Sequence, residues 1–478
     1  MVVNLYFKAK VVSTAQAVTI PYLLEVRWGV VVILKMKMFH EANAPLANGH
    51  KRNALLEISD NEFERNHGFI QWAFPTPQQS SQNQQALAVD LEAAIWLAEK
   101  PDVTEFMEQM TVRFLEFLAA NHHWKRSYNH NHLRISRVIQ SLRVLHSWEL
   151  ANWFYEQVKV FAGDDFELMA KSDGYWAYHA SPLHDKAAGS FVGLAIGDAL
   201  GAPVEFSPRG SFEPVTAYRS GGRFKLPAGA WTDDTAMALC LAQSLIAHNG
   251  LDNTDLLKRF CDWAETGSNT STGIAVGIGQ NTLRTLGDFR RTGRLEALPF
   301  GAKNDGNGSL MRLAPVACFA SNDIALARSV ASAQSRATHA SQAANECCQF
   351  LAELLCRLTR GEGFSNILGS KSNNKWRAAI SNTFPPNLSE ISEADVRSGG
   401  YVVDTLHVAL WSVQNTRTFE EAVLKAVNLG DDADTTGAVT GQIAGACYGY
   451  SSIPRSLKSG LIDERKLYVT SQLLIPNP

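Results

Sequence analysis

The sequence predicts an all-α protein, and two kinds of pattern support this fold class. In the first third of the chain, apolar residues recur at the spacing of amphipathic helices in the stretches 90–121 and 131–161. In the remainder, glycine recurs every fourth residue from Gly189 to Gly201, and two aspartate clusters each precede a run of small and apolar residues. Glycines at this interval line one face of a helix, and aspartate and threonine favour the first turn of a helix. Each of these segments is therefore expected to be helical.

The length and composition indicate a globular protein of more than one domain. At 478 residues the chain is too long for one ordinary hydrophobic core. Lysine and arginine number 44 against 47 aspartates and glutamates, so we expect no nucleic-acid partner. The seven cysteines include no CxxC pair, which favours reduced thiols and a cytoplasmic location over disulfides or zinc.

Shifts in composition divide the chain into four segments. Residues 1–37 contain an apolar run of only six residues, Gly29 to Leu34, whereas a membrane span needs roughly 20. We expect this extension to be poorly ordered, with Met38 as an alternative start, and we expect no membrane association. A small helical domain covers residues 38–165, a polar linker 166–182, and a second domain 183–478.

Two long helical stretches form the predicted first domain. In residues 90–121, Pro101 marks a break between two helices. In residues 131–161, apolar positions predict a buried stripe, with arginines outside it. The stripe consists of Leu133, Ile135, Val138, Ile139, Leu142 and Leu145, and the arginines are Arg134, Arg137 and Arg143.

A histidine-rich stretch, HHWKRSYNHNH at residues 122–132, lies between these helices. Its four histidines could hold a metal ion, or its Lys125 and Arg126 could bind phosphate. A polar interhelical loop ending in a helix cap is the interpretation we favour, because no acidic ligand or i,i+4 histidine pair accompanies the histidines.

Two longer strings in this domain, NHGFIQWAFP from Asn66 and NHNHLRISRVIQSLRVL from Asn129, are unusual in sequence and in order. The domain resembles the conserved region of the opioid growth factor receptor family over roughly 120 residues. The resemblance implies a helical module without known catalysis, and we expect it to direct the protein to a target or to bind a protein partner.

The second domain opens with the glycine series from Gly189 to Gly201. A helical face of four glycines costs roughly 1 kcal/mol per glycine relative to alanine, so another element must approach the bare backbone closely. Tight packing of two helices is the simplest explanation. The same segment also delivers two acidic residues, Asp198 and Glu205, among apolar neighbours.

Two aspartate clusters lie about two hundred residues apart in this domain. The first is WTDDTAMAL, with Thr232 placed to cap a helix and Asp233 and Asp234 in its first turn. The second is GDDADTTGA, with Asp432, Asp434 and Thr435 ahead of another helix of small residues. Taken singly, each cluster is explained by helix capping. Taken together, the two helix starts could face one another as an all-oxygen cage for Mg²⁺, with Mn²⁺ or Ca²⁺ less favoured.

Loops between the clusters offer further polar groups. Asn307, Gly308 and Ser309 form a turn that either binds phosphate ahead of a helix or is purely structural. His339 lies just inside a predicted helix start, where a lone histidine is more often a cap or core residue.

Five motifs in order, GDALGAPVEF, WTDDTAMAL, NGSLMRLAP, THASQAA and DADTTGA, resemble the ADP-ribosylglycohydrolase family of the dinitrogenase-reductase-activating type over residues 183–450. The resemblance implies an all-α fold around two Mg²⁺ ions that hydrolyses the bond between ADP-ribose and a protein acceptor. By motif it implies catalytic roles for Glu205, Asp233 and Asp434. The implied metal shell is Thr232, Asp233, Asp234, Asp432, Asp434 and Thr435. The implied substrate contacts are Asn307, Gly308 and Ser309 at the diphosphate and His339 on the ADP side.

One residue departs from the family pattern. Relatives usually carry two glycines before the DADT motif, whereas this chain has Gly430 and then Asp431, a charged residue beside the expected metals. We expect a Mg²⁺-dependent hydrolase acting on ADP-ribosylated protein, most readily at arginine. A binding protein that recognises an ADP-ribosylated partner, or blocks an ADP-ribosylating toxin, without turnover is the alternative.

Overall fold

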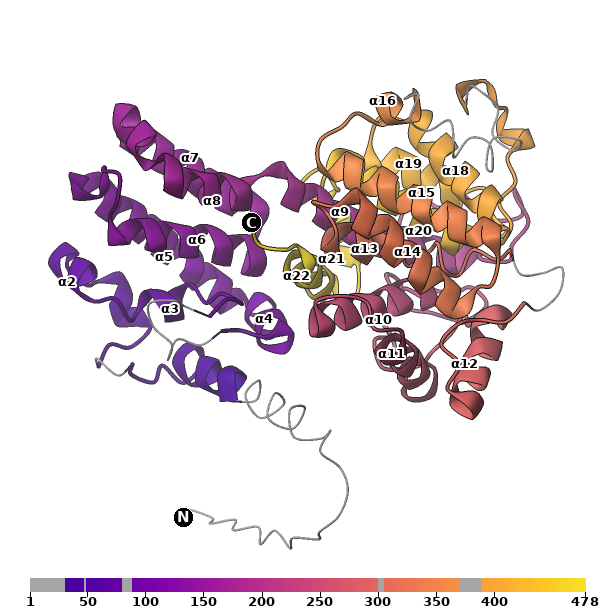
Figure 1. Cartoon of the computed structure of the whole chain (residues 1–478), viewed down its shortest axis with the longest axis horizontal. Helices are drawn as coiled ribbons and strands as arrows, with labels where there is room; N and C mark the ends of the chain where they lie inside the picture. The colour runs from indigo at the N-terminus through magenta and orange to yellow at the C-terminus, as the bar shows by residue number, and fades with distance from the viewer. Residues whose placement is uncertain (1–30, 47–48, 80–87, 300–304, 370–387) are drawn as a thin grey trace, which may run out of the picture.

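The computed structural model describes residues 31–46, 49–79, 88–299, 305–369 and 388–478, and the regular elements in these ranges are helices. The predicted all-α fold class is confirmed. Figure 1 shows two groups of helices side by side, one from indigo to magenta and the other from magenta through orange to yellow.

The first group comprises short and long helices up to residue 180. Its elements are η1 (Asn53–Leu56), α2 (Asp60–Arg65), α3 (Ile70–Ala73), α4 (Leu91–Ala98), α5 (Pro101–Ala120), η2 (His122–Trp124), α6 (His130–Leu145), α7 (Trp148–Ala162), η3 (Gly163–Met169) and α8 (Ala170–Ala180). The break predicted at Pro101 is confirmed, because this proline is the first residue of α5. Stacked rings of Phe63, Phe114 and Phe117 lie in the core of this group.

The arginines of α6 correct the sequence interpretation. Leu133, assigned to the buried stripe, is 51% exposed, whereas Arg134 and Arg143, assigned outside it, are buried. Arg134 donates to the backbone carbonyls of Glu64 and Asn66 at 3.1 and 3.0 Å. Acceptors distant in sequence bind terminal nitrogens of both guanidinium groups, and helical periodicity carries no information about such partners.

The second group holds the remaining helices. They are α9 (Pro182–Gly201), η4 (Ala202–Val204), α10 (Asp233–His248), α11 (Asn253–Thr266), α12 (Gln280–Thr292), α13 (Ala314–Phe319), α14 (Ile324–Thr338), α15 (Gln342–Thr359), α16 (Phe364–Gly369), η6 (Leu388–Glu390), η7 (Glu393–Asp395), α18 (Val402–Gln414), α19 (Phe419–Val427), α20 (Ala433–Tyr448), α21 (Arg455–Gly460) and α22 (Glu464–Leu474).

Helices α9 and α20 pack backbone to backbone, which explains the glycine series. A Cβ atom on a glycine of either helix would collide with the backbone of the other helix. The facing pairs are Gly189 with Gly445, Gly193 with Gly441, and Gly197 with Gly437. The close approach brings the start of α20 beside the end of α9, and this positions the acidic residues of both helices.

The two groups of helices are joined through buried polar contacts. Residues 166–182, expected to be a polar linker, lie mostly in the helical elements η3 and α8. The C-terminal helix α22 packs against both α4 and α9, and Figure 1 shows it between the two groups. From α6, Arg143 donates to the backbone carbonyl and side-chain oxygen of Gln472 on α22 at 3.1 and 2.9 Å. The two domains are therefore connected through buried contacts of α22 as well as through the chain itself.

The end of the N-terminal extension is part of the folded structure. Residues 31–40 are helical, and the side chains of Val32 and Met36 are buried in the core. The expected boundary at Met38 thus falls inside an ordered helix; residues 1–30 lie outside the described residues.

One helical stretch, Trp148–Val204, has the length and hydropathy of a membrane span, but 94% of its apolar window is buried inside the protein.

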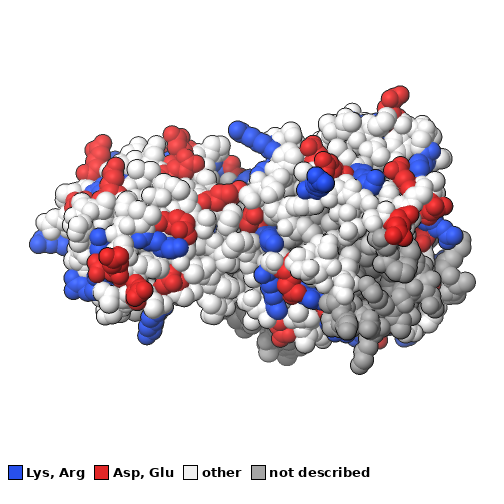
Figure 2. Space-filling model, turned by 90° about the horizontal axis from the view of Figure 1, so that it is seen from above, with Lys and Arg blue, Asp and Glu red and all other residues white. Residues whose placement is uncertain are grey.

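On the face shown in Figure 2, acidic and basic side chains are interspersed.

Candidate functional site

Helix α10 begins beside the end of α9, and Asp198 of α9 connects the two. Thr232 precedes α10 as predicted, but its hydroxyl does not cap the helix. It donates instead to Asp198 Oδ1 at 2.8 Å. The Asp198 carboxylate also accepts from the backbone N–H groups of Thr232 and Thr235 and from the Thr235 hydroxyl. Asp198 therefore provides the N-terminal anion that stabilises α10, although it lies 34 residues earlier in the chain.

The start of α20 is fixed from the opposite side. Asp432 directly precedes the helix, and Asp434 lies in its first turn. The Asn307 side-chain amide donates to Asp432 Oδ2 at 2.5 Å and to the Thr405 hydroxyl at 2.9 Å. Asn307, predicted as a diphosphate ligand, is thus placed as a support for Asp432.

The two helix starts face one another, as the sequence predicts. The structure contains two groups of three carboxylates. Within each group, one oxygen atom from each residue lies within 4.8 Å of the other two. The first consists of Asp198, Asp234 and Asp434, and the second of Glu205, Asp432 and Asp434. Asp434 belongs to both groups, so it lies at the centre of one acidic cluster.

Asp233 occupies a different position from its neighbour Asp234. Gly277, in the loop before α12, has a φ of +83°, and a Cβ there would overlap Asp233 Oδ1. The glycine-rich loop thus passes directly over the Asp233 carboxylate. The sequence motif placed Asp233 in the metal shell but gave no sign of this loop contact, because Gly277 lies outside every recognisable phosphate-loop pattern.

The cluster strongly perturbs the acidity of its members. Burial, followed by the charges of Asp233 and Asp432, raises the pKa of Glu205 to about 8. Burial and the charge of Asp198 raise the pKa of Asp233 to about 8. Burial and neighbouring carboxylates hold the pKa values of Asp234 and Asp434 well above the usual range. Without a cation, the cluster therefore retains protons near neutral pH.

Two oxygen atoms of the cluster are buried without any hydrogen-bond partner in the described structure: Glu205 Oε2 and Asp234 Oδ1. A buried carboxylate oxygen without a partner is costly unless a cation binds it. Oxygen donors without histidine or cysteine suit Mg²⁺, Mn²⁺ or Ca²⁺. The side chains of the cluster therefore fit a hard divalent metal ion.

The predicted phosphate turn lies next to the cluster but is closed by its own hydrogen bonds. The backbone N–H groups of Leu310 and Met311 donate to the Asn307 carbonyl, and helix α13 begins only at Ala314. The Ser309 hydroxyl is fully buried and shares a hydrogen bond with Ser335 at 2.9 Å. The sequence suggested a turn that leads directly into a helix with free N–H groups. In the structure, the N–H groups of Leu310 and Met311 are hydrogen-bonded, and the helix begins later.

His339 packs against this turn. It follows the last residue of α14 rather than lying inside a helix start. A Cβ on Gly308 would lie 3.0 Å from His339 Cε1, so the ring and the turn are in close contact. Burial and the charge of Arg312 lower the pKa of His339 to about 3, which keeps the imidazole neutral. Arg312 also donates to the Gly308 carbonyl at 3.2 Å and thereby fixes the turn.

Asp431 directly precedes Asp432 and has an exposed side chain; burial, and to a smaller extent the charge of Asp431, raises the pKa of Asp432. The φ of Asp431, +54°, lies in the left-handed region, as does that of Gly430 at +72°. This backbone conformation explains why two glycines suit the position. The Asp431 side chain is exposed and accepts a hydrogen bond from the Ser398 hydroxyl at 3.2 Å.

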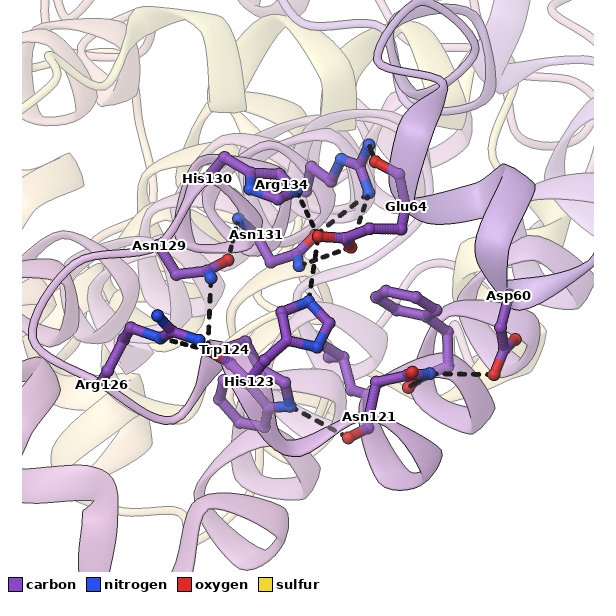
Figure 3. A network of polar contacts seen from close by, with 12 residues as sticks. Asp60, Glu64, Asn121, His123, Trp124, Arg126, Asn129, His130, Asn131 and Arg134 are labelled. Carbon is purple, nitrogen blue, oxygen red and sulfur yellow. Dashed lines mark hydrogen bonds and ion pairs between the residues drawn. The ribbon is translucent and has the colours of Figure 1, made fainter.

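In the first domain, the histidine-rich segment forms a polar network around Glu64 (Figure 3). The imidazoles of His123 and His130 lie 2.9 and 3.0 Å from Glu64 Oε1. The Asn129 side chain caps α6 by accepting from the backbone N–H of Asn131 at 2.8 Å. The interpretation as a polar interhelical loop with a cap is confirmed, and the acidic partner is one that the local sequence did not reveal.

Residues 179–475 match the ADP-ribosylglycohydrolase family model. The chain is 39% identical to ADP-ribosylarginine hydrolase Tri1 of Serratia proteamaculans (strain 568) over 287 residues, 59% of this chain and 77% of the relative. It is 33% identical to ADP-ribosyl-[dinitrogen reductase] glycohydrolase of Rhodospirillum rubrum, over 58% of this chain and 91% of the relative. A solved structure described as an ADP-ribosylglycohydrolase-related protein complex aligns with a TM-score of 0.53 and 36% identity, over 61% of this chain and 97% of that one.

Proposed function

Since the chain belongs to the ADP-ribosylglycohydrolase family and is a glycosyl hydrolase, we propose that it removes ADP-ribose from arginine side chains of a protein in a Mg²⁺-dependent reaction. Two relatives named as ADP-ribosylarginine hydrolases, each 39% identical, support arginine as the acceptor. The observation that carries the metal dependence is the buried, unpartnered Asp234 Oδ1, in a carboxylate group whose other members are Asp198 and Asp434.

Two Mg²⁺ ions are proposed, with Mn²⁺ as a substitute. The ligands would come from both helix starts: Thr232, Asp233, Asp234, Asp432, Asp434 and Thr435. When bound, such ions supply an activated water and an anchor for ribose hydroxyls. Asp198 is a positioning residue, because four N–H and O–H donors from the start of α10 already occupy its oxygens.

Glu205 is our candidate for proton transfer. Its Oε2 atom has no partner, and its pKa of about 8 in the metal-free protein allows it to hold a proton near neutral pH. As the bond to C1 of the ribose breaks, positive charge develops on the sugar, and the surrounding carboxylates stabilise it. Asp233 and Asp434 would orient the attacking water from the two helix starts.

The alternative of a binding protein without turnover depended on a charge at Asp431 beside the metals. That side chain is exposed and accepts a hydrogen bond from Ser398, and burial contributes more than its charge to the raised pKa of Asp432; the retained carboxylate cluster therefore favours turnover over binding alone. The first domain is proposed to direct the hydrolase to its target protein. The free state of all seven cysteines supports a cytoplasmic location.

Peptides ADP-ribosylated at arginine, serine or cysteine test the proposal. We expect the protein to release ADP-ribose from the arginine peptide with Mg²⁺ and to lose this activity in a chelator. Full activity in the chelator would contradict the metal dependence. Release from the serine or cysteine peptide alone would contradict the acceptor.

A further inference from the structure

The first domain contains a cavity of about 810 Å³, distant from the acidic cluster, that the hydrolase reaction does not use. Helices α3, α6 and α8 and the loops at residues 76–79 and 127–129 form its walls. Both sequence strings that mark this domain contribute to the lining. The volume lies in the range of small-molecule sites, which span roughly 300–1,000 Å³.

The lining of the cavity is basic. It contains Arg134, Arg137 and Lys171 but no aspartate or glutamate among the described residues. Burial lowers the pKa of its three histidines, His67, His130 and His132, so that they are neutral at pH 7.

Two of these cations, Arg137 and Lys171, form no ion pair within the part of the chain that the structure describes. Among the described residues, Arg137 donates to two neutral acceptors, the Thr76 hydroxyl at 2.9 Å and the Phe74 carbonyl at 3.4 Å. Arg134 differs, because Glu64 lies 4.0 Å from it in the polar network of Figure 3. An anion entering the cavity would therefore meet Arg137 and Lys171 as its partners.

Aromatic and amide groups accompany the cations. Tyr128 is 78% exposed, and Tyr175 forms part of the wall beside Gln140, whose side-chain oxygen lies 3.5 Å from the tyrosine hydroxyl. Tyrosine side chains that line the same cavity as guanidinium and ammonium groups suit a ligand that combines a planar ring with phosphate. The volume is that of a site for one small molecule, such as a single nucleotide.

We propose that this cavity binds a nucleoside diphosphate, with Arg137 and Lys171 paired to the phosphate oxygens and a tyrosine ring against the base. The site is separate from the hydrolase centre, and it would let the first domain sense or hold a nucleotide-like group while the second domain acts.

The test uses the full chain and ADP as the probe, in buffer containing a chelator. The chelator removes cations from the acidic cluster, so that a nucleotide there would face uncompensated carboxylates. Hydrogen–deuterium exchange locates the bound ADP, and we expect protection in residues 127–140 and 171–175. Protection confined to residues 183–478 would overturn the proposal.

Two variants and a matched control test the role of charge. Lys171→Glu reverses an exposed charge in the cavity, and we expect ADP to bind at least tenfold more weakly. Lys51→Glu makes the same change at an exposed lysine outside the lining and should leave binding as in wild type. Arg137→Gln should also weaken binding, and its melting temperature reports whether the domain remains folded. Equal affinity of Lys171→Glu and Lys51→Glu would refute the site.

Competition separates the two parts of the ligand. Inorganic pyrophosphate should displace ADP from the cavity, because the cations recognise the phosphates. Displacement by adenosine but not by pyrophosphate would contradict the assignment of Arg137 and Lys171. Hydrolysis of an ADP-ribosylated arginine peptide should be unchanged in Lys171→Glu, so failure of the hydrolase proposal and failure of this one remain distinguishable.

Discussion

The substitution Asp434→Asn separates a shared metal site from simple helix capping. Asp434 is 2% exposed and belongs to both carboxylate groups of the cluster. In the metal-free protein, burial and the charges of Glu205, Asp234 and Asp432 all oppose its ionisation. The substitution preserves the shape of the side chain and removes the charge, so it should relieve repulsion and also prevent metal binding.

Glu205 gives the order of magnitude of the penalty that burial, and then repulsion by Asp233 and Asp432, imposes on a charged carboxylate of this cluster. Its pKa is raised from 4.5 to about 8, which at about 1.4 kcal/mol per pH unit corresponds to about 5 kcal/mol. The sign follows from linkage: the folded state holds the proton more tightly, so this stability is present below pH 4.5 and is lost as the pH rises through about 8. The metal-free wild type should therefore become less stable between pH 5 and pH 9.

Mg²⁺ should reverse this loss in the wild type. At a concentration 100 times the Kd, binding to the folded state adds about 2.7 kcal/mol. In chelator at pH 8, we expect Asp434→Asn to be at least as stable as wild type, to gain little from Mg²⁺, and to hydrolyse no ADP-ribosyl-arginine peptide. Helix capping alone predicts a loss of about 1 kcal/mol with or without metal, and little effect on catalysis.

Thermal melts of both proteins at pH 5 to 9, with Mg²⁺ and with chelator, distinguish these outcomes. Asp431→Asn is the matched control, because it makes the same chemical change at the exposed neighbour and should behave as wild type. A wild type that gains no stability from Mg²⁺, together with an Asp434→Asn variant that still hydrolyses substrate, would refute the shared metal site.

Three further outcomes are expected. Gly193→Ala should destabilise the protein by more than about 4 kcal/mol in denaturant melts, because its Cβ would collide with the α20 backbone. The control Gly174→Ala, which has open space around it, should be tolerated. Equal stabilities of the two variants would contradict the backbone packing of α9 and α20. Asp431→Gly should raise the free energy of unfolding by up to about 1 kcal/mol, because glycine adopts a φ of +54° without strain. The rate of hydrolysis should be unchanged in this variant. Lost activity would place the Asp431 carboxylate in the active site. Removal of residues 1–37 should lower the melting temperature by several degrees, because it deletes the fully buried side chain of Met36; an unchanged melting temperature would show that the helix at 31–40 adds no stability.

Much of the candidate site was visible in the sequence. The aspartates at 233, 234, 432 and 434 were assigned to two helix starts, and the structure places these starts face to face. The aspartate clusters could be recognised because residues close together in sequence determine where a helix starts. Two clusters of carboxylates, which repel one another when ionised, also suggest a shared cation. The Asn307–Ser309 turn was less predictable, because the N–H groups of Leu310 and Met311, which follow it, donate to the Asn307 carbonyl.

The sequence by itself determined the helices, the glycine face of α9 and the two acidic helix starts, because periodicity and capping act between residues a few positions apart. Only the tertiary structure decided which groups meet. It made Asp198 the N-terminal anion of a helix 34 residues away, buried Arg143 against Gln472, and left the Asp431 side chain exposed on a left-handed backbone. The physical reason is that buried charges require partners, and a partner distant in sequence leaves no mark on the residues around either one.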